Sequence, residues 1–183
     1  MKEISLNILD IVENSVKAKA TLTEIIIEES EDTLVLTVKD DGCGMSEETV
    51  KSVTNPFYTT RKTRKVGLGI PLLKLACEQT GGSLYITSKV ADSSDDTHGT
   101  TVRACFFKNH LDYTPLGSVI DTMSTLIQGH PDTDFRLYHT TPKGEVSLDT
   151  REVRAVLVDI PLNSYEVIKW IEGFLEEQYE QIV

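Results

Sequence analysis

The sequence lacks several features, and each absence excludes a class of protein. It has only three cysteines, Cys43, Cys77 and Cys105, and no C-x-x-C pair. An odd number without that spacing argues against a disulfide framework or a cysteine-rich zinc site. No apolar run approaches the ~20 residues that span a bilayer, and the first residues do not follow the pattern of a signal peptide. We therefore expect a cytoplasmic protein without a membrane partner.

Basic side chains are also scarce. The chain has 18 Lys and Arg against 29 Asp and Glu, for a net charge of −11, of which residues 109–183 carry −8. Such a surplus of negative charge repels a phosphate backbone, so we expect no nucleic-acid partner. The exception is a cluster of four basic residues, Arg61, Lys62, Arg64 and Lys65. If any segment neutralises phosphate, we expect it to be this one.

What is present is the periodicity of a compact α/β protein. The length of 183 residues fits one domain, or one domain with a small appendage. Apolar spacing, turn residues and caps predict helices over 3–19, 46–53 and 70–79, and strands over 24–29, 34–38, 83–89 and 100–107. This order predicts an α+β fold over residues 1–108, a two-layer α/β sandwich.

The composition changes after Asn109. The pattern then predicts a helix over 116–128, strands over 134–139 and 145–148, a helix beginning near 148–157, and a last helix after Ser164. We interpret residues 109–183 as a small acidic α/β C-terminal unit.

Three short patterns could carry chemistry. Asp10 and Asn14 are four apart on the first helix and share a face, as a magnesium site or a water-orienting pair would require. Asp40 ends a strand just before two glycines, where a carboxylate can accept a hydrogen bond from an exocyclic amine such as that of adenine. The alternatives are a solvated polar stripe and a plain Asp-Gly turn.

The third pattern is Gly67-Leu68-Gly69, which opens onto a helix. Free N–H groups and the positive end of the helix dipole make such a place suited to phosphate. The spacing fits neither a Rossmann G-x-G-x-x-G motif nor a P-loop.

Taken together, these fragments are more specific than any of them alone. In chain order they are Asp10-Ile-Val-Glu-Asn14, Asp40-Asp-Gly-Cys-Gly44-Met45, Asn55-Pro-Phe-Tyr-Thr-Thr60-Arg61, Gly67-Leu-Gly69 and Gly99-Thr100. This order and spacing resembles the GHKL ATPase superfamily of gyrase, the heat-shock chaperone, histidine kinases and MutL. The resemblance covers residues 3–108 and implies the ATP-binding fold named after Bergerat.

The resemblance implies a role for each matching residue. Asn14 matches the asparagine that binds Mg²⁺, and Asp40 matches the aspartate that reads the adenine amino group. Gly42 and Gly44 match the glycines that let the base lie close. Thr100 matches the threonine whose hydroxyl supports that aspartate, often through a water.

The remaining matches concern the phosphates. Arg61 occupies the place of a lysine that approaches the γ-phosphate, and Lys62 belongs to the same cluster. Gly67 and Gly69 match the second glycine box, whose N–H groups meet the phosphates. The implied cofactors are therefore ATP and Mg²⁺.

Two departures from the family pattern bear on the reaction. Hydrolytic members carry a glutamate as general base four residues before the asparagine, where this chain has the shorter Asp10; Glu13 is a poor substitute. A histidine kinase also needs a helical hairpin that presents a phosphoacceptor histidine, and we find no such context around any of the four histidines, His98, His110, His130 and His139.

Two functions follow. The first is a stand-alone ATP-dependent phosphotransferase or ATPase acting on a partner protein, similar to anti-sigma serine kinases, with Asp10 as the catalytic residue and the basic cluster on the transferred phosphoryl group. The second is a nucleotide-gated switch that binds and regulates a partner with little turnover.

Overall fold

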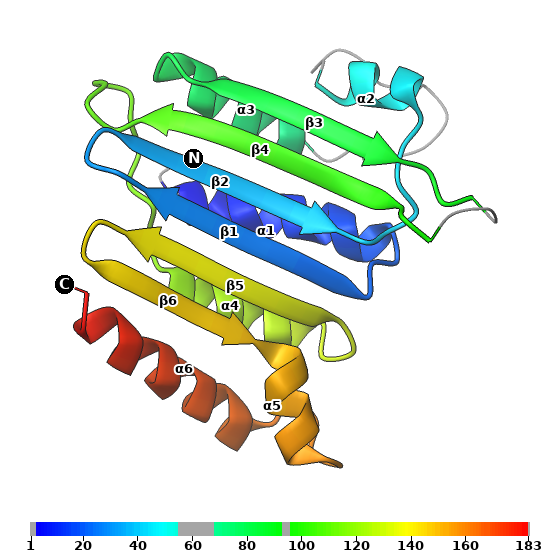
Figure 1. Cartoon of the computed structure of the whole chain (residues 1–183), viewed down its shortest axis with the longest axis vertical. Coiled ribbons are helices and arrows are strands. Elements are labelled where there is room, and N and C mark those ends of the chain that lie inside the picture. Colours follow the sequence, from blue (N-terminus) through cyan, green and yellow to red (C-terminus); the bar gives the residue numbers. More distant parts are fainter. Residues whose placement is uncertain (1–2, 55–67, 93–95, 183) are drawn as a thin grey trace.

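The computed structural model describes residues 3–54, 68–92 and 96–182. Over these ranges the chain forms six helices and one six-stranded sheet (Figure 1). The helices are α1 (Ile4–Lys17), α2 (Glu47–Val53), α3 (Gly69–Gln79), α4 (Val119–Gly129), α5 (Thr150–Leu157) and α6 (Tyr165–Glu180). The strands are β1 (Leu22–Glu29), β2 (Thr33–Asp40), β3 (Ser83–Lys89), β4 (Gly99–Phe107), β5 (Asp134–Thr141) and β6 (Gly144–Asp149). None of the helices in this part of the chain has the length and hydrophobicity that crossing a bilayer requires.

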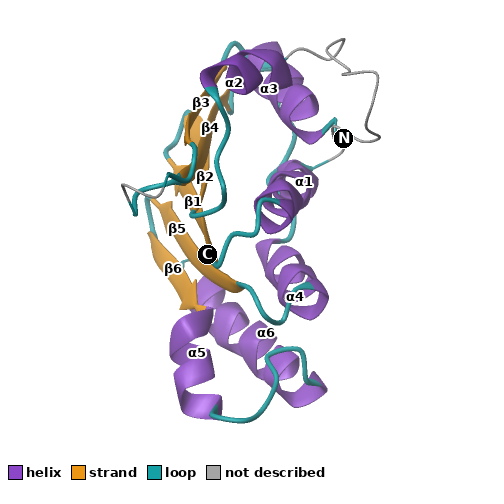
Figure 2. Cartoon of the chain, turned by 90° about the vertical axis from the view of Figure 1, so that its right-hand side faces the viewer, coloured by secondary structure: helices purple, strands orange, loops and turns teal. Residues whose placement is uncertain are grey.

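The sheet has the order β3-β4-β2-β1-β5-β6. All neighbouring strands are antiparallel except β1 and β5, which are parallel. Helices α1, α3 and α4 lie on one side of it (Figure 2). That face is apolar because alternate residues of a strand point the same way: in β1, Ile25 and Ile27 are buried, whereas Glu28 is exposed. The predicted two-layer α/β sandwich is confirmed.

Helix α1 carries the first of the site residues and is fixed by its apolar stripe. Ile4, Ile8 and Ile11 recur at helical spacing, and all three are buried in the common core with the inner face of the sheet. The opposite side of α1 is left for polar residues. The helix expected over 3–19 is confirmed, with its ends one or two residues further in.

The C-terminal segment continues the same sheet. β5 pairs along the whole of β1, from Leu22 opposite Asp134 to Glu28 opposite Thr140, and β6 follows as the outer strand. The boundary expected at residue 108 falls in the connection between β4 and α4. Residues 109–183 thus add α4, β5, β6, α5 and α6 to a sheet that begins in the N-terminal part, with no break in the hydrogen bonding between strands.

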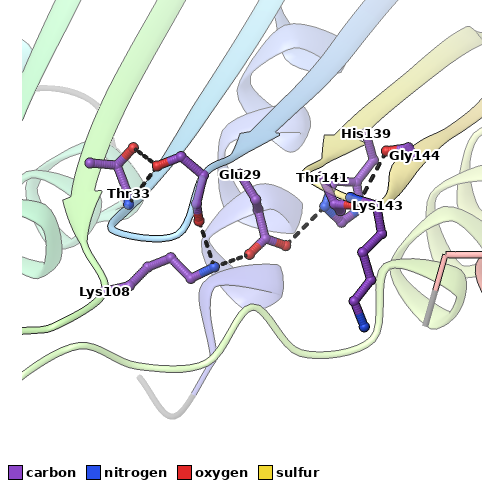
Figure 3. Close-up of polar contacts among 8 residues, drawn as sticks. Glu29, Thr33, Lys108, His139, Thr141, Lys143 and Gly144 are labelled. Carbon is purple, nitrogen blue, oxygen red and sulfur yellow. Dashed lines mark hydrogen bonds and ion pairs between the residues drawn. The ribbon is translucent and has the colours of Figure 1, made fainter.

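A polar cluster at the end of β1 ties these two parts together (Figure 3). Lys108 Nζ donates to Glu29 Oε2 over 2.8 Å, and His139 Nε2 donates to Glu29 Oε1 over 3.0 Å. The other ring nitrogen of His139 lies 2.8 Å from the hydroxyl of Tyr179 on α6. The hydrogen bond from His139 and the ammonium of Lys108 hold the pKa of Glu29 at about 2 rather than 4.5, although burial acts to raise it.

Candidate functional site

A cavity of about 220 Å³ lies between α1, the ends of β2 and β4, and the start of α3. Four of the residues expected from the sequence line it: Asn14, Asp40, Gly44 and Thr100. The rest of the lining is mainly apolar and comes from Ile11, Ala18, Val38, Met45, Val53, Ile70 and Val102, with Ser15 and Cys43. The arrangement is a small apolar pocket with a few convergent polar groups, which is the usual form of a small-molecule site.

The carboxylate of Asp40 is the most strongly held polar group of the cavity. Its Oδ1 accepts hydrogen bonds from the N–H of Gly42 at 2.9 Å and from the N–H of Thr100 at 3.3 Å. Its Oδ2 accepts one from the hydroxyl of Ser15 at 2.7 Å. An ionised carboxylate has about four acceptor positions, so Oδ2 can accept a further hydrogen bond from a ligand.

The neighbouring Asp41 has a different task. Its carboxylate accepts hydrogen bonds from the hydroxyl and N–H of Thr21 and, at 3.0 Å, from the N–H of Leu22. Burial acts to raise the pKa of Asp41, but these hydrogen bonds outweigh it and lower the pKa. Asp41 therefore closes the connection into β1 and is absent from the cavity lining.

The two glycines after Asp40 are required by close backbone contacts. A Cβ on Gly42 would lie 2.8 Å from the Cβ of Ala18. Gly44 has a φ of +72°, and a Cβ there would lie 1.9 Å from the carbonyl oxygen of Lys89. The ring of His98 fixes the same turn, since its Nδ1 lies 2.6 Å from the carbonyl oxygen of Gly42 and must carry the proton. The turn therefore brings its backbone to the cavity in one fixed shape.

Thr100 contacts Asp40 directly through its backbone. Its backbone N–H reaches the carboxylate, whereas its hydroxyl lies 2.8 Å from the hydroxyl of Ser88. Ser88 in turn accepts a hydrogen bond from the N–H of Met45 at 2.7 Å. Through this series of hydrogen bonds, β3 and β4 fix the position of the glycine turn relative to the Asp40 carboxylate.

The polar face of α1 meets the start of α3. Asn14 lines the cavity, and Asp10, one turn earlier, is exposed at the junction with α3. A Cβ on Gly69 would lie 2.9 Å from the Cβ of Asp10, so this glycine permits the close approach of the two helices. Glu13 is drawn away, because its carboxylate is 2.6 Å from Nε2 of His130. Of these two carboxylates, only Asp10 is at this junction.

The other expected phosphate contacts cannot be placed. Arg61, Lys62 and Gly67 lie outside the described residues, as does the Asn55-to-Arg61 motif. Within the described ranges, no group of three or more His, Cys, Asp or Glu side chains is arranged to hold a metal ion.

Sequence reasoning missed Ser15, Ser88 and His98. Ser15 had a usable signal, because it is a polar residue at a position of α1 that the apolar stripe would fill, and it is buried. Ser88 and His98 had none, because their partners are 43 and 56 residues away in the chain.

Known proteins resemble the chain both in sequence and in fold. Sporulation kinase C of Bacillus subtilis is 31% identical over 96 residues, which are 51% of this chain and 22% of that protein. The sensor histidine kinase YvrG of the same organism is 33% identical over 82 residues, covering 42% and 14%. The chain thus spans less than a quarter of the length of these relatives.

Two solved structures share the fold at low sequence identity. The MutL ATPase domain of Aquifex aeolicus, complexed with ADP, has a TM-score of 0.51 at 14% identity, over 86% of this chain and 70% of that one. The N-terminal domain of a DNA repair protein has a TM-score of 0.54 at 16% identity, over 81% and 52%. Both likenesses cover more of the chain than residues 1–108 alone, so they include part of the C-terminal segment.

The sequence pattern of one family matches most of the N-terminal part. The family is described as "Histidine kinase-, DNA gyrase B-, and HSP90-like ATPase", and the match runs over residues 2–110. This range contains all the residues of the cavity. The chain therefore belongs to the histidine kinase-, DNA gyrase B- and HSP90-like ATPase family.

Proposed function

We propose that the cavity binds the adenine base of ATP and that the chain uses Mg·ATP to act on a partner protein. The observation that carries the proposal is the Asp40 carboxylate, held by three donors at an apolar pocket with Oδ2 still able to accept. The adenine amino group is a donor of the right kind for that oxygen. The apolar lining suits the flat faces of the base.

The size of the cavity supports a base rather than a whole nucleotide. Pockets for drug-sized ligands enclose roughly 300–1,000 Å³, and this one encloses about 220 Å³. The triphosphate would then extend past Asn14 toward the start of α3. There, the N–H groups of Gly69 and Ile70 in the first turn of α3 would favour anions.

Magnesium fits this arrangement as an ion held mainly by the nucleotide. Mg²⁺ takes oxygen ligands and usually keeps several waters while bridging phosphates. The amide oxygen of Asn14 offers one such ligand beside the expected path of the triphosphate. When bound, the ion would neutralise phosphate charge, and Asn14 would set its position.

For the reaction we favour phosphoryl transfer to a partner protein, or hydrolysis, with Asp10 orienting or deprotonating the attacking group. We assign this role to Asp10 rather than to Glu13, because the carboxylate of Glu13 is paired with His130. Arg61, Lys62 and Gly67 would supply further contacts to the phosphates. The relatives named as kinases are consistent with transfer to protein.

A nucleotide-gated switch is the second candidate, and the shortness of Asp10 favours it. An aspartate has one methylene less than the glutamate of hydrolytic relatives, so it reaches less far toward a water. In that case ATP binding alone would alter how a partner is bound.

Calorimetry with Mg·ATP tests the nucleotide site. Asp40→Asn should weaken ATP binding about 10- to 100-fold, the usual worth of a hydrogen bond to a charged group. Asp41→Asn is the matched control, because it removes an adjacent carboxylate that faces away; we expect less than a threefold change. GTP, which presents a carbonyl in place of the amino group, should bind at least as weakly to wild type as ATP does to Asp40→Asn. Equal binding of ATP by wild type and Asp40→Asn would refute the site.

Formation of ADP separates the two candidate functions, because both hydrolysis and phosphoryl transfer to a partner convert ATP to ADP, whereas binding alone does not. If the chain turns ATP over, Asp10→Asn should abolish turnover while leaving ATP affinity unchanged, and Glu13→Gln should behave as wild type. Binding without any formation of ADP, alone or with candidate partner proteins, would support the switch and exclude both the ATPase and the phosphotransferase.

A further inference from the structure

Exposed apolar side chains gather at the C-terminal end of the sheet. Of the 15 large apolar side chains that are exposed in the described part of the chain, six fall between residues 156 and 174. They are Val156, Val158, Ile160, Tyr165, Trp170 and Phe174. A run of 19 residues thus carries two fifths of the exposed apolar side chains, more than scattered surface residues would give.

A groove of about 600 Å³ is lined by three of these side chains, Val156, Trp170 and Phe174, where α5 and α6 meet the middle of β5 and the end of β6. Val153 and Val156 of α5 form one wall, and Trp170 and Phe174 of α6 form the other. The rings of Trp170 and Phe174 are stacked at 5.2 Å between centroids with 9° between their planes. The two side chains therefore hold a flat, rigid apolar surface although Trp170 is 55% exposed.

The loop beside the groove is strained. Val158 has a φ of +55°, which is a genuine outlier for a β-branched residue. Its side chain is 80% exposed, so no burial offsets the strain. Strain at an exposed apolar residue beside a groove is compatible with a surface that a ligand covers.

The charge around the groove is negative in sum, since Arg136 in its lining is paired with Glu24 at 3.4 Å. The basic side chains of α5 and α6 are all in ion pairs: Arg151 with Asp149, Arg154 with Asp134 and Lys169 with Glu172. The carboxylates have no such partner among the described residues at six positions of this region: Glu152, Asp159, Glu166, Glu176, Glu177 and Glu180. Of these carboxylates Glu152 lines the groove itself, and the helices and the loop that form it carry more acidic than basic side chains.

The outer strand β6 is closed to strand addition. Gln178 of α6 accepts a hydrogen bond from the N–H of Ser147 and donates one to the carbonyl oxygen of Ser147, both at 3.0 Å. The side-chain amide thus occupies the place that an added strand would take. A partner must use the space between α5 and α6, which suits a helix rather than an extended peptide.

We propose that this groove binds an amphipathic helix of a partner protein, with apolar residues on one face and Lys or Arg along its flanks. A second copy of the chain fits less well, because it would bring two surfaces of the same charge together, and the chain carries −11 overall. The site is separate from the nucleotide cavity and does not depend on the function proposed for it.

The single tryptophan of the chain gives a direct readout, since it is Trp170 in the groove wall. The probe is a 14-residue helical peptide of leucine and lysine, added to the full chain with and without Mg·ATP. We expect saturable one-to-one binding and a shift of Trp170 emission to shorter wavelength, the same in both conditions. A matched peptide with glutamate in place of lysine should not bind.

Two variants locate the binding. Val156→Ser removes an apolar side chain that is 82% exposed, so the fold should survive, and affinity should fall about fivefold. Glu152→Lys should lower affinity about three- to tenfold, whereas Glu31→Lys, the same change at the β1–β2 turn, should have little effect. Equal binding of both peptides, or unchanged affinity in Val156→Ser and Glu152→Lys, would overturn the proposal. So would sedimentation of the free chain as a dimer that Val156→Ser dissociates.

Discussion

The carboxylate of Glu29 provides a prediction whose magnitude follows from the structure. Its side chain is 18% exposed and bonded to both Lys108 and His139, and its pKa is lowered from 4.5 to about 2. Because one pKa unit corresponds to about 1.4 kcal/mol, this difference amounts to about 3 kcal/mol of folding stability. The folded state binds the proton more weakly, so the contribution is complete above pH 4.5 and is lost as the pH falls toward 2.

Urea unfolding of wild type and Glu29→Gln at a series of pH values measures this contribution. We expect the variant to be less stable by about 3 kcal/mol at pH 7, and the gap to narrow steadily between pH 5 and pH 2. Glu28→Gln is the control: Glu28 is the exposed neighbour on the other face of β1, and its replacement should change stability by less than about 0.5 kcal/mol. A gap between wild type and Glu29→Gln that stays constant over the whole range would refute the reasoning.

Three further predictions concern the nucleotide cavity and its surroundings. Ser15→Ala removes a donor to the Asp40 carboxylate, which we propose reads the base, and should weaken ATP binding about fivefold by calorimetry. Unchanged affinity would mean that the carboxylate needs no such support. Gly44 has a φ of +72° and lies against a backbone carbonyl, so Gly44→Ala should lower the free energy of unfolding in urea by more than about 2 kcal/mol. By contrast, Gly173→Ala in α6, with open space around it, should raise the free energy of unfolding by about 0.5–1 kcal/mol. Similar effects at the two positions would contradict the strain argument. At pH 8 a disulfide reagent should label the exposed Cys43, and Mg·ATP should slow this labelling because Cys43 lines the cavity. Cys77 should be protected from the reagent, because burial raises its pKa to about 11. Labelling of Cys43 at the same rate with and without ATP would count against its position in the site.

Local structure could be predicted from the sequence because it depends on neighbours in the chain. The apolar spacing of α1 gave the helix and its buried face. Ser46 gave the start of α2, where its hydroxyl accepts a hydrogen bond from the N–H of Thr49. The alternation in β1 and β2 gave two strands whose register the structure fixes from Thr23 opposite Asp40 to Glu29 opposite Leu34.

What could not be predicted depends on partners far apart in the chain. The strand at residues 134–139 was expected, but its parallel pairing with β1 follows from packing that no local pattern encodes. The hydrogen bond between the hydroxyls of Thr100 and Ser88 on β3 was likewise not expected from the sequence. Such contacts are decided by strand register, where a shift of one residue turns every side chain to the other face.

The parallel pairing of β1 with β5 has a practical consequence for anyone who isolates the ATPase half. In a fragment ending at residue 108, β1 would change from an interior strand to an exposed edge strand, with unpaired backbone donors and acceptors facing water. An exposed edge strand can form hydrogen bonds with strands of other molecules, so we expect the shortened protein to aggregate or polymerise. The C-terminal segment would then serve to cover the edge of β1, with β5 in the place that a strand of another molecule could take.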